Sequence, residues 1–295
     1  MIYKFITNHP EMAGYAVSCG VNRIFVDMEY LGKEERQGHL DTHRTRHTLA
    51  DVRNIRSAVP ETELMVRVNP VHRGSASEIA GVIRAGADII MLPMFTNAAQ
   101  VEQVGRFIDG ACKLSLLLET PQAFVRLNEI LEQEAFIDEI HVGLNDLHLG
   151  FGLDFMFEVL ADGVVDVIAG KVHETGTRFG FGGVARVGEG AVPAELILGE
   201  HVRLGSEMVI LSRTFHQNAG SVAELKNKLD LREEMEKLDA CLNEFSRAGQ
   251  EALEENRQKL AVAVRSVVHA KTMAAQVKFP AIKIKSPAVK VKTPA

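Results

Sequence analysis

Two acidic side chains stand just beyond short apolar segments of the sequence. Glu119 directly follows Leu116–Leu118, and Asp146 comes shortly after the apolar run that ends at Val142. An ionised carboxylate at the rim of such a run needs a partner, because removing a charge from water is costly. Two carboxylates can share a hard cation such as Mg²⁺, which keeps sites for waters and substrate oxygens. Glu119 and Asp146 are therefore candidate metal ligands, and helix capping is the other role open to both.

A basic residue and two further acids end neighbouring apolar segments. Arg67 lies in Met65–Asn69, where strand alternation turns it away from its apolar neighbours. Its planar guanidinium suits a carboxylate, although a structural bridge between strands is the alternative. Asp27 and Glu29 share one side of an earlier strand, and one of them could hold a water, a histidine or Arg67. We expect Arg67 and Asp27 to act in catalysis.

The histidines offer two interpretations. His39, His43 and His47 are spaced four residues apart, which on a helix would place all three on one face, as in a zinc site. Glycine and short polar residues nearby favour an irregular loop instead. We therefore expect one histidine, His47 or His43, to reach the site as a general base. His148, just beyond Asp146, is expected behind the site or at the surface.

The polar residues above follow segments that are typical of β-strands. Eight short runs rich in Val, Ile, Leu and Phe are predicted strands: Ile2–Thr7, Arg23–Met28, Leu64–Asn69, Asp88–Leu92, Lys113–Leu118, Glu139–Gly143, Arg178–Gly182 and Glu207–Leu211. Segments with helical spacing lie between them, at Glu11–Ser18, Ala50–Ala58, Ala76–Ala85, Ala98–Ile108, Pro121–Ala135, Phe155–Thr175 and Ala194–Leu204. Alternating strands and helices imply a parallel sheet.

This order predicts an α/β fold of the (β/α)₈ TIM-barrel type over residues 1–220. Eight strand–helix units in about 220 residues match a closed barrel better than an open sheet. No Gly-x-Gly-x-x-Gly follows the first strand, which argues against dinucleotide binding. The run Gly180–Gly183 is interpreted as a tight turn, with a phosphate cradle as the alternative. In a barrel, strand carboxyl ends meet at one mouth, so the polar residues should converge there.

The chain changes character after residue 220. Apolar residues recur at helical intervals from Leu225 to Val267, which predicts an amphipathic helical extension over residues 221–276. Residues 277–295 alternate lysine with apolar residues, contain three prolines and no acid, and are predicted to be a flexible basic tail. Docking of this tail onto an acidic partner or a membrane surface is the alternative. The stripe is long enough to drive association, so we expect a homo-oligomer, such as a dimer or a trimer of dimers.

Composition excludes several classes of protein. The formal net charge of −6 disfavours a nucleic-acid-binding protein, because nonspecific grip requires clustered Lys and Arg. The three cysteines are far apart, which suggests neither a disulfide framework nor a thiolate zinc site. No apolar stretch reaches the length of a membrane span, and the amino terminus lacks a signal-peptide pattern. We expect a soluble, cytoplasmic protein.

Five motifs together resemble those of the HpcH/HpaI aldolase and citrate lyase β-subunit family. They occur in order at Phe25–Glu29, Val66–Pro70, Gly86–Met94, Leu118–Thr120 and Val142–Leu147. The resemblance extends from about residue 2 to 220 and implies a metal-dependent aldolase. It implies that Glu119 and Asp146 bind Mg²⁺, Mn²⁺ or a similar ion such as Co²⁺, and that Arg67 contacts the oxo acid or its enolate. Asn145, beside Asp146, is expected to contact substrate.

The sequence departs from the pyruvate aldolases of this family at two positions. Tyr30 replaces a histidine after the acidic end of the second strand, and Leu117 replaces a glutamine two residues before the metal glutamate. The Arg-Val-Asn-Pro run at 67–70 is more similar to the citrate lyase members, which cleave thioesters. The extension after residue 220 fits neither pattern.

We expect a metal-dependent carbon–carbon lyase that acts on a 2-oxo acid such as pyruvate or oxaloacetate, with an aldehyde as its other substrate. The metal would stabilise an enolate. Two other functions remain open: a citrate lyase type of acyl-CoA or thioester lyase or synthase, and a barrel without activity that serves as a scaffold. Three converging charged residues argue against the last, because a scaffold has no need of them.

Overall fold

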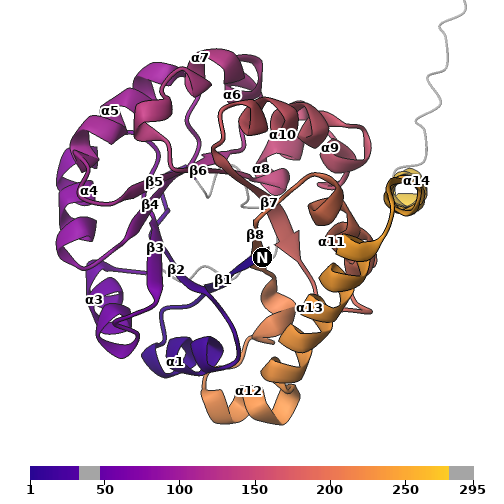
Figure 1. Ribbon diagram of the computed structural model, residues 1–295, viewed down its shortest axis with the longest axis horizontal. Coiled ribbons are helices and arrows are strands. Elements are labelled where there is room, and N and C mark those ends of the chain that lie inside the picture. The colour runs from indigo at the N-terminus through magenta and orange to yellow at the C-terminus, as the bar shows by residue number, and fades with distance from the viewer. Residues whose placement is uncertain (33–46, 279–295) are drawn as a thin grey trace, which may run out of the picture.

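The structure, a computed structural model, is a closed barrel of eight parallel strands (Figure 1). It describes residues 1–32 and 47–278. The strands are β1 Ile2–Ile6, β2 Arg23–Asp27, β3 Glu63–Arg67, β4 Ile89–Leu92, β5 Lys113–Leu118, β6 Glu139–Val142, β7 Arg178–Val184 and β8 Met208–Leu211. Each strand pairs with the next along the chain, and β8 pairs with β1. The predicted fold is therefore confirmed, with all eight strands near their predicted positions.

The helices form a ring around the barrel, as Figure 1 shows. They are α1 Pro10–Ser18, α3 Leu49–Ala58, α4 Ser75–Arg84, α5 Ala98–Ile108, α6 Pro121–Val125, α7 Leu127–Leu131, α8 Leu144–Phe151, α9 Glu158–Ala161, α10 Val164–Glu174, α11 Ala194–Arg203, α12 Val222–Lys228, α13 Leu231–Arg247 and α14 Gln250–Lys278. Short 3₁₀ helices occupy Glu134–Phe136 and Arg213–Phe215. Five predicted helices appear as single helices at nearly the predicted bounds.

Three local predictions were wrong. The predicted helix Pro121–Ala135 is broken into α6, α7 and a 3₁₀ turn. The predicted helix Phe155–Thr175 is divided at Gly163, whose φ of 83° does not belong to a right-handed helix. The Gly180–Gly183 run lies within β7 rather than in a turn, at a register shift against β8. A side chain at Gly180 would overlap the carbonyl oxygen of Met208, so close strand approach explains this glycine.

The barrel has two separate hydrophobic clusters. The larger one fills the space between the sheet and the surrounding helices. The smaller one lies on the inner face of the strands and consists of Phe25, Met65, Ile89, Met91 and Leu117. Charged residues lie along the same strands on both sides of this inner layer, at positions that strand alternation also turns inward. The apolar layer therefore separates the barrel mouth from a buried ionic cluster below it.

Arg23 is the centre of the buried ionic cluster. Its Nη1 donates to both carboxylate oxygens of Glu139, at 2.7 and 3.0 Å, and its Nε and Nη2 donate to Glu63 at 3.1 and 2.7 Å. Lys4 Nζ lies 3.7 Å from Glu139. Burial raises the pKa of Glu139, but Lys4 and Arg23 outweigh this effect and hold the pKa below its usual value. These pairs join β1, β2, β3 and β6 across the barrel interior.

Lys4 also contacts His141, another fully buried residue. Burial lowers the pKa of Lys4 to about 8, although Glu139 opposes this shift. His141 Nε2 lies 2.9 Å from the Gly182 carbonyl oxygen, so Nε2 carries the proton and Nδ1 accepts from Lys4 at 3.4 Å. Burial, and then the charge of Lys4, lower the pKa of His141 well below its usual value. A neutral His141 therefore anchors the irregular part of β7.

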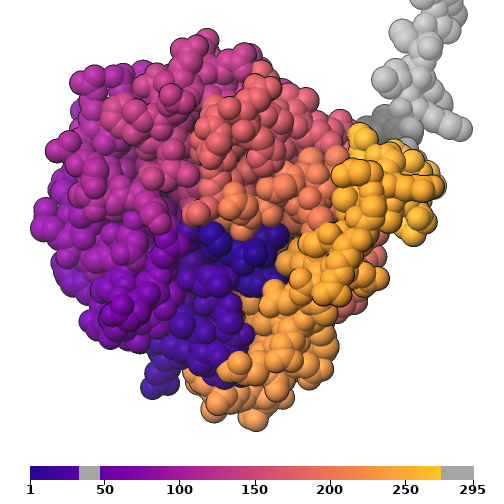
Figure 2. Space-filling model, viewed as in Figure 1, coloured from indigo at the N-terminus to yellow at the C-terminus, as the bar shows by residue number. Residues whose placement is uncertain are grey.

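The C-terminal extension packs along one side of its own barrel (Figure 2). Its helices α13 and α14 both contact α11. Asn256 is a buried polar group in this interface, where its Nδ2 donates to Leu196 O at 3.0 Å and to Glu200 Oε1 at 3.1 Å. Gly199 makes room for it, because a side chain at 199 would overlap Asn256. The extension is therefore an integral layer of the barrel, divided into three helices.

The apolar stripe of the extension is largely buried within the single chain. Its buried members are Leu225, Leu229, Leu231, Met235, Leu238, Leu242, Leu253, Leu260 and Val264. The argument that this stripe would be exposed in a single chain was therefore wrong. The homo-oligomer stays a prediction, and the apolar stripe no longer supports it. Among residues 1–32 and 47–278, no helix is long and apolar enough to cross a membrane. The predicted flexible tail lies outside the described residues from residue 279 onward.

The buried ionic cluster generates a stability prediction. Replacing Glu139 by Ala leaves Arg23 and Lys4 buried without their shared carboxylate, so unfolding free energy should fall by about 3–5 kcal/mol. Urea unfolding followed by circular dichroism measures this change. Glu207→Ala is the matched control, because Glu207 is an exposed acid at the same end of the barrel, and we expect a change within about 0.5 kcal/mol. Equal effects of the two substitutions would contradict the structural role of Glu139.

Candidate active site

The carboxyl ends of β2 and β3 are joined by an ion pair. Arg67 Nε donates to Asp27 Oδ1 at 2.8 Å, and Arg67 Nη2 donates to Asp27 Oδ2 at 2.7 Å. Glu29 Oε2 lies 3.4 Å from Arg67 Nη1, and the Glu29 amide donates to Asp27 Oδ1. Strand alternation places Asp27 and Arg67 on the inner face, opposite each other in register. Of the three partners expected for one of these acids, namely a water, a histidine or Arg67, the structure pairs Asp27 with Arg67 and also brings Glu29 near it.

The environment of Arg67 is strongly acidic. Burial lowers the pKa of Arg67, but the charges of Asp27, Glu29 and Glu119 outweigh burial and raise the pKa above its usual value. The guanidinium also lies over the ring of Phe25, 5.8 Å from its centroid. Phe25 belongs to the inner apolar layer, which therefore forms a floor beneath the arginine. Arg67 is permanently charged here and is held by groups from β2 and the segment that directly follows it.

Glu119 follows β5 directly and is 3% exposed. Its Oε1 accepts from the Met94 amide at 3.2 Å, and Met94 has a φ of 54°. Its Oε2 lies only 2.7 Å from where a Cβ would stand on Gly143. The Glu119 carboxylate thus lies against the residue that begins α8. Thr120, the next residue, caps α6 instead, so capping is not the role of Glu119.

Asp146 lies in the first turn of α8, a helix that the sequence analysis missed. The signals are visible in retrospect: Leu144, Leu147 and His148 share one buried face, and Gly152 ends the helix with a φ of 71°. A carboxylate in a first helical turn is favoured by the helix dipole, and Glu119 adjoins the same turn. The two predicted ligands therefore meet at one helix N-terminus. His148 Nδ1 faces the Leu144 carbonyl oxygen within this helix.

His47 lies beside Asp27, but the ring nitrogen that could accept a proton faces the Asp27 backbone amide. Its Nδ1 accepts the Asp27 amide proton at 2.9 Å, so the neutral ring carries its own proton on Nε2. To act as a base, the ring would first have to release the Asp27 amide. The alternative of a zinc site at His39, His43 and His47, and that of His43 as the base, involve residues outside the described part of the chain. Tyr30, at the family's histidine position, is half exposed.

The family model for HpcH/HpaI aldolase/citrate lyase matches residues 5–155, about half of the chain. This range contains Asp27, Arg67, Glu119 and Asp146. The chain belongs to the HpcH/HpaI aldolase/citrate lyase family. The predicted resemblance is confirmed, and membership indicates an enzyme of the lyase or aldolase type.

Solved structures agree with this family at the level of the fold. The HpcH/HpaI aldolase from Desulfitobacterium hafniense DCB-2 superposes with a TM-score of 0.57 and 13% identity, over 84% of this chain and 94% of that one. An HpcH/HpaI aldolase/citrate lyase family protein from Burkholderia cenocepacia J2315 gives 0.58 and 13%, over 77% and 95%. No curated protein sequence matches the chain as a relative. At such identities the comparison supports the barrel and not a substrate.

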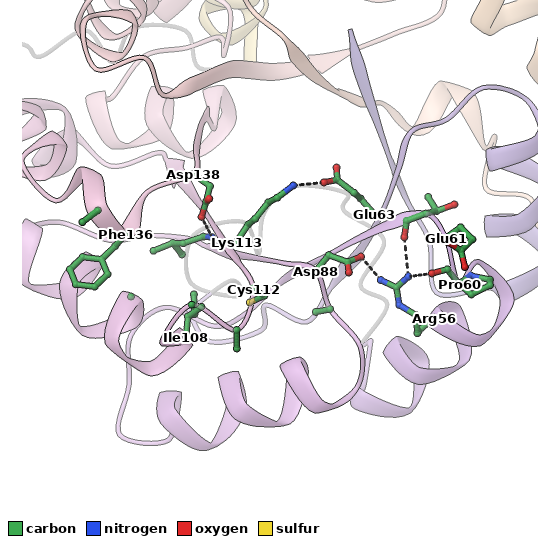
Figure 3. Close-up of a pocket in the computed structure, with 17 residues that line it drawn as sticks. Arg56, Pro60, Glu61, Glu63, Asp88, Ile108, Cys112, Lys113, Phe136 and Asp138 are labelled. Carbon is green, nitrogen blue, oxygen red and sulfur yellow. Dashed lines mark hydrogen bonds and ion pairs between the residues drawn. The ribbon is translucent and has the colours of Figure 1, made fainter.

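A hollow lies at the end of the barrel opposite to the residues of the mouth. It has a volume of about 650 Å³ and is lined at the amino ends of β3, β4 and β5. Figure 3 shows that its charged groups are linked to one another, with Lys113 joined to Glu63 and Arg56 joined to Asp88. In a TIM barrel, the amino-terminal face contributes stability and the carboxyl-terminal face carries chemistry. We therefore assign the active site to the mouth.

Several residues of the site were not singled out from the sequence. Gly143 provides the space for Glu119, and Met94 provides a backbone donor. Asn69 binds the amides of Tyr30 and Leu31, which follow Glu29. Asn69 belongs to the motif at Val66–Pro70, but the amides that it binds are 39 and 38 residues earlier in the sequence. Gly143 could have been found only by asking which strand end lies next to Glu119.

The ion pair at the mouth predicts an effect on stability. Arg67→Ala leaves Asp27 and Glu29 without their cation, so the free energy of unfolding should fall by about 3 kcal/mol. Urea unfolding in the presence of EDTA measures this, because a chelator prevents added cations from compensating. Arg106→Ala removes an exposed arginine from an i,i+4 surface pair, and we expect a loss below about 1 kcal/mol. Similar losses in both variants would show that the mouth tolerates unpaired carboxylates.

Proposed function

We propose that this chain is a divalent-metal-dependent carbon–carbon lyase that acts on a 2-oxo acid such as pyruvate or oxaloacetate. The supporting observation is the charge balance at the mouth. Asp27, Glu29, Glu119 and Asp146 are all wholly or largely buried at or just after the carboxyl ends of strands, and the first three interact with the Arg67 guanidinium. If every group of this set is ionised, its formal charge is −3. Such a set favours a cation, and a cation in turn favours an anionic substrate.

The residues that would hold the metal are Glu119 and Asp146. Both carboxylates adjoin the first turn of α8, and Gly143 leaves room for the first of them. In the described part of the chain, no three His, Cys, Asp or Glu side chains cluster as a metal cage. A pair of carboxylates suits Mg²⁺ or Mn²⁺ better than Zn²⁺, because Mg²⁺ retains waters and substrate oxygens. When bound, the ion supplies Lewis-acid stabilisation of negative charge on oxygen.

Arg67 is the residue that we assign to the substrate. Arg67 has five N–H groups, and three of them, one each on Nε, Nη1 and Nη2, point at Asp27 and Glu29. The second N–H groups of Nη1 and Nη2 are the other two. These can bind a carboxylate or keto oxygen of the oxo acid. Because two strands hold the guanidinium before substrate arrives, little conformational freedom is lost on binding. Arg67 would then stabilise negative charge that develops on oxygen as the carbon–carbon bond breaks.

Proton transfer is assigned to the Asp27 side of the mouth. The Asp27 carboxylate, held beside Arg67, would orient a water towards the hydroxyl of an aldol. His47 orients the Asp27 backbone in the structure and would present an N–H from Nε2. Asn145, in the first turn of α8, is half-buried beside Asp146 and remains a proposed substrate contact. The half-exposed Tyr30 stands at the position of the family's histidine, so we assign the role of general base to the Asp27 side of the mouth.

The decisive experiment compares 4-hydroxy-2-oxo acids with acyl-CoA substrates. Each is assayed with Mg²⁺, Mn²⁺ and Co²⁺ before and after EDTA. Metal-dependent release of pyruvate supports the proposal. Thioester cleavage alone would favour the citrate lyase type of reaction, for which the Arg-Val-Asn-Pro run provides the argument. An absence of turnover with both classes would favour a barrel that serves as a scaffold.

Substitution of the two ligands tests the metal assignment. Glu119→Gln or Asp146→Asn should lower metal-dependent kcat/KM by about 100-fold or more, because each removes a ligand charge. The thermal midpoint should change little, since neither substitution removes apolar volume from the core. Glu102→Gln, an exposed acid on α5, is the control and should retain wild-type kinetics. Full activity and unchanged Mn²⁺ affinity in both ligand variants would disprove the assignment.

The glycine that begins α8 provides an independent test of the same site. Gly143→Ala introduces a methyl group where the Glu119 carboxylate lies, so Mn²⁺ affinity should fall by about 10-fold or more. Isothermal titration with Mn²⁺ measures this without an activity assay. Gly170→Ala is the control, because a Cβ there meets open space on α10 and favours the helix. Wild-type Mn²⁺ affinity in Gly143→Ala would show that Glu119 does not bind the ion from its present position.

A further inference from the structure

A chain of side-chain hydrogen bonds leads from the surface to the mouth. It runs from His72 through Glu78 to Asn69, and from there to the backbone amides of Tyr30 and Leu31. Asn69 is 3% exposed, while Glu78 and His72 are progressively more open to solvent. None of these groups has a role in the reaction proposed above. A buried amide with this many partners therefore requires its own explanation.

The surface end of the chain fixes the direction of its hydrogen bonds. The Gly74 amide donates to His72 Nδ1 at 3.0 Å, so the proton of the neutral ring lies on Nε2. His72 Nε2 faces Glu78 Oε2 at 2.9 Å, where the carboxylate can only accept. One oxygen of Glu78 is thus committed to His72. The other oxygen, Oε1, is directed at Asn69.

The inner end fixes the same direction independently. The amides of Tyr30 and Leu31 both donate to Asn69 Oδ1 at 3.0 Å. The amide nitrogen of Asn69 must therefore point the other way, and its Nδ2 donates to Glu78 Oε1 at 2.7 Å. The backbone amide of Asn69 also faces Glu78 Oε1, at 3.2 Å. An amide side chain accepts through its oxygen and donates through its nitrogen, as these partners require, which explains asparagine here.

The segment that Asn69 holds carries the acids of the mouth. Tyr30 and Leu31 directly follow Glu29, whose carboxylate contacts Arg67 and whose amide contacts Asp27. Asn69 itself stands two residues after Arg67. It therefore forms a second tie between the ends of β2 and β3, beside the Asp27 ion pair. If this tie is lost, the Glu29 segment can move away from the guanidinium.

We propose that Asn69 is a positioning residue that holds the Glu29–Leu31 segment on Arg67 and so fixes how the guanidinium meets the oxo acid. Glu78 and His72 orient the Asn69 amide from behind. This inference rests on the proposed function for its substrate, and on hydrogen bonds alone for the positioning. Arg67 keeps its charge when Asn69 is lost, so stabilisation of developing charge is largely retained, whereas the contact that binds the oxo acid loses its fixed position. The main consequence of losing Asn69 is therefore a higher KM rather than a lower kcat.

The first arm of the test is kinetic. Asn69→Ala should raise KM for the oxo acid about 10-fold, a change of about 1.4 kcal/mol, with a smaller effect on kcat. Asn256→Ala is the matched control, since it removes another buried asparagine with two hydrogen bonds but far from the mouth. It should lower the thermal midpoint and leave KM unchanged. A KM in Asn69→Ala equal to wild type would overturn the positioning role.

The second arm reverses the polarity of the hydrogen bonds. Asn69→Asp keeps the acceptor for Tyr30 and Leu31 but sets a carboxylate against Glu78, so KM should rise as in Asn69→Ala. Adding Glu78→Gln supplies an amide donor to the new carboxylate and leaves an oxygen for His72. The double variant should recover most of the wild-type KM, although the Asn69 backbone contact is weakened. A double variant as impaired as Asn69→Asp would show that the chain of hydrogen bonds does not act as proposed.

The third arm does not depend on activity. Amide hydrogen exchange measured by mass spectrometry should be faster in the peptide containing Tyr30 and Leu31 when Asn69 is Ala, and unchanged in Asn256→Ala. Unchanged exchange in Asn69→Ala would disprove the tie between the two strand ends. If the wild-type protein turns over no oxo acid and binds no pyruvate, the proposed function fails. The exchange result then still decides whether Asn69 holds this segment.

Discussion

Repulsion between carboxylates is the constraint on which the mouth of this barrel depends. Asp27, Glu29, Glu119 and Asp146 come from three different parts of the chain and carry one sign of charge into largely buried positions. Arg67 offsets part of that charge, and the first turn of α8 offsets another part through its dipole. The remaining excess is what a divalent ion would neutralise. Charge that would be a liability in a structural protein is thus the property on which the proposed binding of a cation and an anionic substrate rests.

The interior of the barrel isolates that charge from a second set. The Arg23 cluster below is nearly balanced within itself, with Glu139 and Glu63 facing Arg23 and Lys4. Between the two sets lies an apolar layer that includes Phe25 and is closed on all sides by strands. The layer is apolar and buried, so no polar group within it links the two sets. Each must find its partners locally, and this is why both sets are extensively paired.

Much of this arrangement could be predicted from the sequence because the signals are local. Eight short apolar runs in alternation with helical segments specify the barrel, and an acid directly after such a run, as at Glu119, locates a strand end. What could not be predicted depends on contacts between distant residues. Helix α8 was missed because its start coincides with a predicted strand end, and its Gly143 matters only because Glu119 comes from the neighbouring strand. The extension was predicted to be helical. Its packing on this barrel depends on contacts of α13 and α14 with α11, which the sequence pattern does not reveal.

The charge balance at the mouth also explains why the group that positions the guanidinium is a neutral amide. A further charged residue at the end of β3 would alter the balance between the carboxylates and Arg67. Asn69 ties the two strands together with an amide, which accepts two hydrogen bonds and donates another without adding net charge. The charged member of that chain, Glu78, lies behind the amide and directs its other oxygen at His72. Position and electrostatic potential at the mouth are therefore controlled by different residues, so the segment around Glu29 can be held firmly without any change in the charge on which the proposed binding of cation and substrate rests.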